Sequence, residues 1–143
     1  MSFDLKIKNG DIVVGRTGDI DIVFDNEKLK QDVIKILLTG IGENKFHTYY
    51  GSAIGSLDIG SIPDQAIIEM DMTTSAEESI RNLMRLQSSQ GRSQFLTPGE
   101  QIIEILGVEA VRDQDDPRSY NVYVSLLTRK LTNITESVVV KIA

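Results

Sequence analysis

The sequence contains no cysteine and a single histidine among its 143 residues. Without cysteine, neither a disulfide framework nor a thiolate metal site can form. The one histidine, His47, gives little support to a Ser/His/Asp triad or to a zinc site of the usual histidine-rich kind. We therefore expect a protein that holds no metal and no cofactor.

Long apolar runs and excess positive charge are also missing. The longest apolar stretches, such as residues 36–38 and 138–140, are far too short to span a bilayer. Residues 1–10 lack the apolar run of a signal peptide. Fifteen basic against 21 acidic residues give a net charge of −6, which repels phosphate backbones. We expect a soluble protein made in a cytoplasm, with neither nucleic acid nor membrane as a partner.

The length fits one domain, residues 1–143, which buries roughly two-thirds of its unfolded surface. From Asp4 to Phe24 polar and apolar residues alternate, which is the period of a β-strand. Asn9-Gly10 is the dipeptide that best accepts a two-residue hairpin turn. Residues 1–24 are therefore predicted to form a β-ribbon, although an extended arm would show the same alternation.

Two helices are predicted in the middle of the chain. The first has apolar residues at three- and four-residue steps, a cap at Asp25 or Asn26, and an end at Thr39–Gly40 where glycine takes the left-handed conformation. The second covers residues 75–86, with Ser75 and Glu78 as a capping box. A short helix within residues 52–61 and a polar, mobile loop at residues 87–93 complete this region. The apolar face of the first helix consists of Leu29, Val33, Ile36 and Leu37.

The last third, residues 100–143, is predicted to be a C-terminal β region. Its β-branched and alternating stretches give the chain an α+β fold, in which an antiparallel or mixed sheet packs against two main helices. The valine-rich terminal strand, with Val138, Val140 and Ile142, leaves an edge free to pair with another chain. The alternative is a strand enclosed by its own sheet.

Two short motifs suggest ligand binding but are better explained as turns. Gly40-Ile41-Gly42 follows a helix rather than a strand, and it lacks the lysine and the third glycine of a phosphate loop. Asp113, Asp115 and Asp116 could attract calcium, but the glycine and the bidentate glutamate of an EF-hand are missing. A solvated hairpin turn is the better interpretation of this acidic cluster.

Glu43 is the strongest candidate for catalysis, because a glutamate beside glycines could serve as the general acid of a glycosidase. That chemistry needs a second carboxylate at roughly 5 to 9 Å. Asp58 is the nearest acidic candidate along the chain, and nothing around it indicates a cleft. Alternatively, Glu43 accepts backbone N–H groups or meets a partner's arginine. We expect no enzymatic activity.

The spacing between the first helix and a later Tyr-Gly-Ser is the most specific pattern in the chain. It resembles the baseplate wedge family of contractile-tail bacteriophages, the gene 25-like or GPW family, which is similar to TssE of type VI secretion machines. The family's later Glu-Pro-Arg motif falls by position on residues 100–102, where only Glu100 is kept, and its arginine after Gly-Glu is replaced by Asn44. The residues that carry the resemblance are Gln31, Asp32, Leu37, Leu38, Thr39, Gly42, Glu43, Tyr50, Gly51 and Ser52.

The resemblance implies a structural role in the tail baseplate of a virion assembled in the host cytoplasm. Expected partners are the wedge core proteins and the tail sheath protein, with six copies per baseplate and strand pairing that starts sheath assembly. A peptidoglycan-hydrolysing lysozyme that uses Glu43, or a small regulatory adaptor, are the alternatives. The expected partner contacts are Gly42, Glu43, Tyr50, Gly51, Glu100, Val138, Val140 and Ile142.

Overall fold

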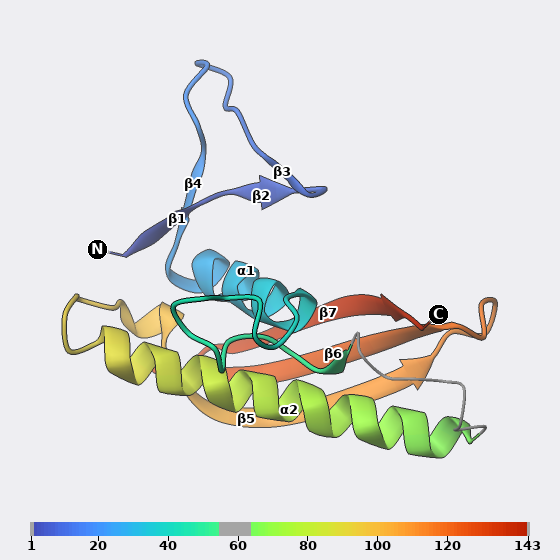
Figure 1. The fold of residues 1–143 in the computed structure, drawn as a ribbon. Helices are drawn as coiled ribbons and strands as arrows, with labels where there is room; N and C mark the ends of the chain where they lie inside the picture. Colours follow the sequence, from blue (N-terminus) through green and yellow to red (C-terminus); the bar gives the residue numbers. More distant parts are fainter. Residues whose placement is uncertain (1, 55–63, 143) are drawn as a thin grey trace.

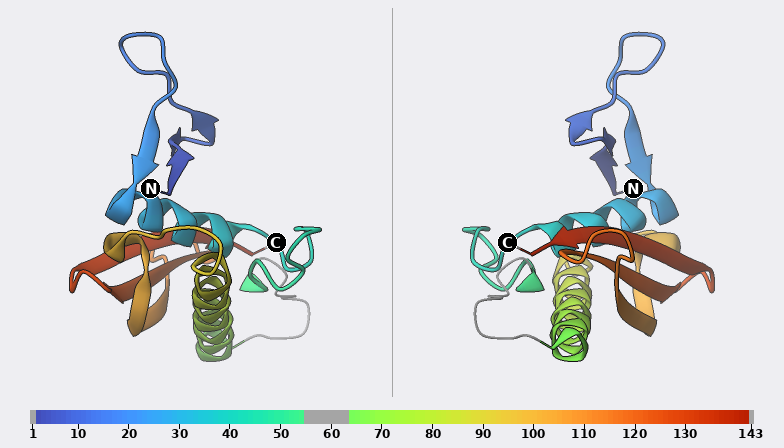
Figure 2. Two further views of the ribbon diagram at one scale, coloured as in Figure 1. Left: turned by 90° about the vertical axis from the view of Figure 1, so that its left-hand side faces the viewer. Right: turned by 90° about the vertical axis from the view of Figure 1, so that its right-hand side faces the viewer.

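The computed structural model describes residues 2–54 and 64–142, and it shows the predicted α+β fold. Two helices pack against a three-stranded sheet, and an N-terminal ribbon projects away from this body (Figure 1). Figure 2 shows that the ribbon stands on the side of the first helix that faces away from the sheet. The predicted ribbon, the two main helices and the C-terminal strands are therefore present, but several boundaries differ.

The N-terminal ribbon is built from two short antiparallel pairs. Its hairpin turn is the predicted one, because Asn9 and Gly10 both have positive φ angles, of 54° and 79°. At Lys6 the two pairs meet, since its N–H donates to Asp21 and its carbonyl accepts from Val13. The strands are β1 (Phe3–Leu5), β2 (Ile7–Lys8), β3 (Asp11–Ile12) and β4 (Ile22–Phe24).

Helix α1 (Asp25–Leu38) buries the predicted face and begins and ends near the predicted residues, but neither end is capped as predicted. Phe24, whose side chain has no hydrogen-bond acceptor, occupies the cap position, and the Asp25 carboxylate lies 2.9 Å from the Thr97 hydroxyl. The helix ends at Thr39 with an extended backbone, and its hydroxyl donates to the Lys35 carbonyl at 2.6 Å. A side chain thus supports the last turn where a left-handed glycine was predicted.

Helix α2 (Gln65–Gln90) is longer than predicted at both ends. Its N-terminal cap is Asp64, whose carboxylate accepts from the Ala66 N–H at 3.0 Å, so the predicted capping box at Ser75 is wrong. Burial of Ile68 and Met72 extends the apolar stripe upstream and explains the earlier start. Neither this helix nor any other in residues 2–54 and 64–142 is long and apolar enough to cross a membrane.

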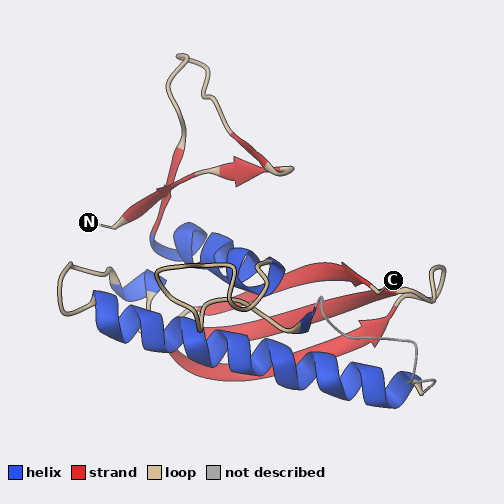
Figure 3. Cartoon of the chain, in the orientation of Figure 1, coloured by secondary structure: helices blue, strands red, loops and turns tan. Residues whose placement is uncertain are grey.

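The C-terminal sheet is antiparallel, with strand order β5-β6-β7. Alternate residues of β6 and β7 face the two helices and form the core, and the opposite face is partly exposed. Figure 3 shows the helices on one face of this sheet. The acidic cluster at residues 113–116 lies in the turn between β5 and β6, as the turn interpretation predicted. The elements are η3 (Pro98–Glu100), β5 (Ile102–Arg112), β6 (Ser119–Thr128) and β7 (Asn133–Lys141).

Candidate protein-protein interface

Strand β7 lies at the edge of the sheet. The backbone N–H and C=O groups of its successive residues therefore point alternately toward β6 and toward the open edge. The Thr128 N–H donates to Thr132 at one end of the β6–β7 ladder, and the Ile142 N–H donates to Arg118 at the other. The register between these ends has no bulge, so hydrogen-bonded pairs recur at every second residue. Even-numbered residues of β7 therefore bond to β6. The residues whose backbone groups point to the open edge are Asn133, Thr135, Ser137, Val139 and Lys141.

Within residues 2–54 and 64–142, no backbone hydrogen bond reaches the outer edge of β7. Five consecutive odd-numbered residues thus present N–H and C=O groups in the spacing that a further strand would need. No bulge interrupts this edge. An unpaired edge of this length is a template for strand addition.

The predicted contact residues on this strand are placed differently from the expectation. Val138, Val140 and Ile142 are buried at 5%, 8% and 5% exposure, because their side chains pack under the helices. Their side chains therefore belong to the core and do not form the surface. Val139 is 59% exposed on the opposite face. A partner at this edge would meet backbone atoms and the side chain of Val139.

The loop after α1 closes back on itself beside the end of β7. The Ser52 N–H donates to the Thr39 carbonyl at 2.7 Å, and Gly40 pairs with Ser52 in an isolated parallel bridge. Glu43 holds the inside of this loop, since its carboxylate accepts from the Gly40 N–H at 3.2 Å and its own N–H donates to the Gly40 carbonyl. Glu43 therefore has the structural role that was weighed against catalysis: it accepts a backbone N–H.

Gly51 is required by the geometry of this closure. Its φ angle is 126°, and a Cβ atom placed there would lie 2.7 Å from the Gly40 carbonyl oxygen. Real Cβ atoms do not approach backbone this closely, so a side chain would force the loop apart. Gly42, at φ 86°, supplies the second left-handed position but has open space around it. Of these two glycines, Gly51 is the one fixed by packing.

A groove of about 710 Å³ separates this loop from the end of β7. The last turn of α1, the loop and residues 139–141 line it. Leu38, Ile41 and Val139, which border the groove, are 62%, 52% and 59% exposed. The open strand edge therefore lies next to an apolar depression, and that combination can receive both the backbone and the side chains of an added strand.

Tyr50, another predicted contact, lies half-buried against the core on the other side of the loop. Burial raises the pKa of its phenol, and the nearby Lys35 ammonium only partly opposes this shift. Its neighbour Tyr49 packs under the Arg85 guanidinium, whose carbon lies 4.4 Å from the ring centre. These aromatic side chains attach the loop to the two helices.

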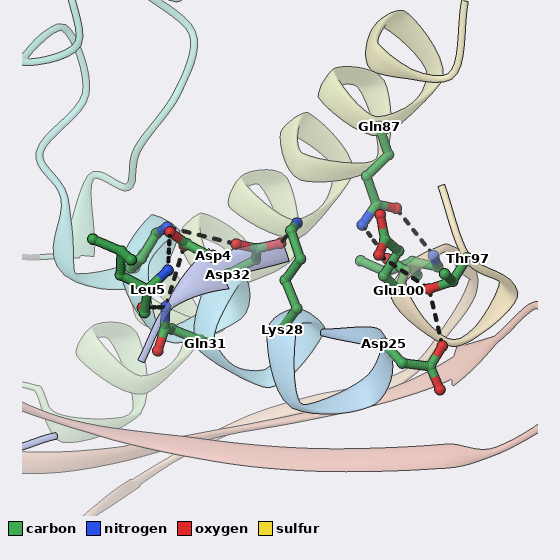
Figure 4. A network of polar contacts seen from close by, with 11 residues as sticks. Asp4, Leu5, Asp25, Lys28, Gln31, Asp32, Gln87, Thr97 and Glu100 are labelled. Carbon is green, nitrogen blue, oxygen red and sulfur yellow. Dashed lines mark hydrogen bonds and ion pairs between the residues drawn. The ribbon is translucent and has the colours of Figure 1, made fainter. Parts of the chain in front are cut away.

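A polar network attaches the ribbon to α1 (Figure 4). The Gln31 amide donates to the Leu5 carbonyl at 2.8 Å and accepts from the Ile7 N–H at 2.9 Å. Lys35 donates to the Asp4 carboxylate. Burial alone would lower the Lys35 pKa, but Asp4 and Asp32 outweigh it and leave the pKa raised. The polar contacts between the ribbon and α1 are thus hydrogen bonds to one strand edge and one ion pair.

Glu100, the last predicted contact, lies in the interior at 1% exposure. The Thr97 hydroxyl lies 3.0 Å from its Oε2 and 2.9 Å from Asp25 Oδ1, and its one proton can serve either acceptor. In the part of the chain that the structure describes, Glu100 Oε1 has no hydrogen-bond partner. Gln87, from the end of α2, donates to the Glu100 carbonyl at 2.6 Å and accepts from the Ile102 N–H. Glu100 is therefore buried in this structure, and a partner contact at this residue stays a prediction. Gln87, predicted in a mobile loop, is instead a buried helical residue.

A second groove, of about 780 Å³, contains the carboxylates of Asp4, Asp32 and Glu43. A glycosidase acid needs a carboxyl whose pKa is raised so that it holds a proton. For Asp4, burial raises the pKa, but hydrogen bonds from Lys35, Leu5 and Gln31 and the Lys35 charge leave it lowered. Asp58, the other carboxylate considered, lies outside the described residues, as does most of the short helix predicted within residues 52–61.

A solved structure has the same fold. It is the crystal structure of a protein from Geobacter sulfurreducens for which a tail-lysozyme identity has been proposed. It superposes with a TM-score of 0.60 and covers 82% of this chain and 90% of that chain. At 15% sequence identity, the similarity concerns the fold. No family model and no curated protein matches the sequence.

Proposed function

We propose that this protein is a structural wedge subunit in the baseplate of a contractile tail or a related injection machine. In this role it links the wedge core to the first ring of the tail sheath, in six copies per baseplate. The fold shared with the Geobacter protein and the spacing of the helix and the Tyr-Gly-Ser turn support the assignment. Its place would be the virion tail, after assembly in the host cytoplasm.

The observation that carries the proposal is the open edge of β7. The five outward residues offer N–H and C=O groups, and the adjacent groove offers apolar surface. A strand from a sheath subunit would pair antiparallel or parallel with this edge and place alternate side chains against Val139 and Ile41. The first sheath ring would thus continue a sheet that this subunit begins. The proposal requires no bond to be made or broken in a substrate.

Removing one outward N–H tests this mode of binding. Val139→Pro deletes an N–H that points to the open edge, and proline is tolerated on an edge strand when its missing donor faces solvent. We expect the variant to keep its fold by circular dichroism and to lose binding to the purified tail sheath subunit. Val139→Thr is the matched control, because it keeps both the N–H and the branched shape. Equal sheath binding by the two variants would contradict strand pairing at this position.

A peptidoglycan hydrolase is the second candidate, favoured by the identity proposed for the Geobacter protein. Glu43 would be its acid, facing the groove that also holds Asp4 and Asp32. Against this, the Glu43 carboxylate already accepts the Gly40 N–H. Clearing of purified cell wall by the protein, abolished by Glu43→Gln, would support the enzyme. Absence of clearing by the unaltered protein would end this candidate.

A further inference from the structure

The outer face of the N-terminal ribbon is apolar along its whole length and covered by nothing in the described chain. Large apolar residues occupy directly opposed positions on neighbouring strands, so their side chains share one face. Each is between 38% and 61% exposed. The four opposed pairs are Phe3 with Phe24, Leu5 with Ile22, Ile7 with Ile12, and Val14 with Ile20.

This face is as large as the largest apolar patches that ordinary monomers expose. With on the order of 200 Å² for a fully exposed residue of this size, the eight residues together expose about 800 Å², backbone atoms included. The largest patch on a typical monomer is roughly 300–600 Å². A stable interface needs about 800 Å² from each partner. One copy of the ribbon face therefore supplies the area of one side of a stable dimer.

The charges of the ribbon permit a second copy to approach. Residues 1–24 contain three basic and four acidic side chains, so the ribbon is nearly neutral although the whole chain carries −6. Because charged residues such as Asp4, Lys6 and Lys8 alternate with the apolar ones along each strand, they belong to the opposite face. The ribbon also projects from the body, so the acidic bodies of two copies stay apart (Figure 2). Repulsion between the two copies is therefore weak at this face.

We propose that the ribbon faces of two copies pack against each other and join the free protein into a dimer. The interface would be isologous, with each apolar row meeting the same row of the second copy about a twofold axis. Two ribbons stacked this way form a small β-sandwich with about 10 Å between layers. This pairing uses a surface distinct from the edge of β7 and does not depend on the proposed tail function.

Sedimentation velocity of the purified full chain across the micromolar to sub-millimolar range tests the inference. We expect a monomer–dimer equilibrium. Val14→Asp places a charge in the opposed pair nearest the turn at residues 15–18. It should weaken the dimer by at least about tenfold without unfolding the body. Val139→Asp is the matched control, because Val139 is 59% and Val14 is 61% exposed. The Val139→Asp variant places the same charge on the C-terminal sheet and should leave the dimer intact.

Two outcomes overturn the inference. A monomer at every concentration would mean that the ribbon face awaits a partner of different chemistry. A dimer weakened by Val139→Asp and not by Val14→Asp would mean that two copies join through the edge of β7. Val139→Pro distinguishes the two proposals, because it should lose sheath binding and keep the dimer. Failure of one proposal therefore does not mimic failure of the other.

Discussion

The N-terminal ribbon and the C-terminal sheet have the same alternation of polar and apolar residues, but their apolar faces end in opposite environments. In the sheet, Val122 and Val124 are 0% and 1% exposed beneath the two helices. In the ribbon, Val14 and Ile20 are 61% and 51% exposed. The difference arises from the helices, because α1 contacts β7 and α2 contacts β5, and the ribbon meets α1 only near its base. Strand periodicity therefore predicts a two-faced sheet but does not say which faces are covered.

The two regions are also held by different kinds of interaction. The sheet is fixed by burial of a continuous apolar core, and the ribbon is fixed by Gln31, Lys35 and the buried side chain of Val23. Polar contacts at a partly exposed site contribute little to stability. The ribbon should therefore open locally at a lower free energy than the body.

The largest expected contrast is between truncation of the core and truncation of the ribbon. Ile36→Ala, at a position with 0% exposure, should lower the free energy of unfolding by about 3–4 kcal/mol. Ile20→Ala should change it by less than about 0.5 kcal/mol, because this side chain packs on nothing in the described body. Urea unfolding at low protein concentration measures both. Comparable losses would show that the ribbon and the body form one core.

Glycine replacement gives a contrast of intermediate size. Gly51→Ala should destabilise the protein by about 2–3 kcal/mol, since the new Cβ would meet the Gly40 backbone in addition to the strain of a positive φ. Gly10→Ala has the same kind of φ but open space, and should cost about 1 kcal/mol. Thermal unfolding of the two variants checks the difference. If the ribbon variant loses as much stability as the loop variant, the close packing around Gly51 is refuted.

The smallest expected effect is the pH dependence of ribbon attachment. The Asp4 pKa is lowered in the folded protein, so its contribution is fully present above the ordinary value of 3.8 and is lost as pH falls through the folded value. The Lys35 pKa is raised, so its contribution is present below the ordinary value of 10.5 and is lost as pH rises through the folded value. Attachment should therefore be strongest between these limits.

Asp4→Asn should remove the acid-side dependence and weaken attachment by about 1 kcal/mol or less, because the pair is partly exposed. Amide exchange of the ribbon, measured as a function of pH, reports this change. Asp19→Asn, at the exposed tip, is the control. The same response from both variants would argue against the Asp4–Lys35 link.

Periodicity and turn residues predicted most of the fold, because these signals are local. The face of α1 centred on Leu29 and Val33 and the turn at Asn9-Gly10 follow from spacing alone. The start of α2 was missed because Ser75 and Glu78 imitate a capping box inside a helix, where Ser79 donates to the Ser75 carbonyl. The spacing of Ile68, Met72, Ala76 and Ile80, four residues apart, would have shown the longer helix.

The candidate interface was only partly predictable, because exposure depends on contacts between distant segments. Glu100 is polar and beside a proline-glycine turn, yet Gln87 from the end of α2 and Thr97 enclose it. Likewise, the terminal valines were predicted as partner contacts, but the helices cover their side chains. No local sequence pattern shows that Glu100 and the terminal valines are buried, since their burial depends on where α1 and α2 pack.

Amide hydrogen exchange along β7, resolved residue by residue by NMR, tests the central claim most directly. In the free protein, the outward N–H groups of residues 133, 135, 137, 139 and 141 should exchange rapidly, and those of the even-numbered residues between them slowly. Adding the tail sheath subunit should slow the odd-numbered set. Odd-numbered amides that are already protected in the free chain, or that exchange just as rapidly in the complex, would contradict an open strand edge that receives a partner.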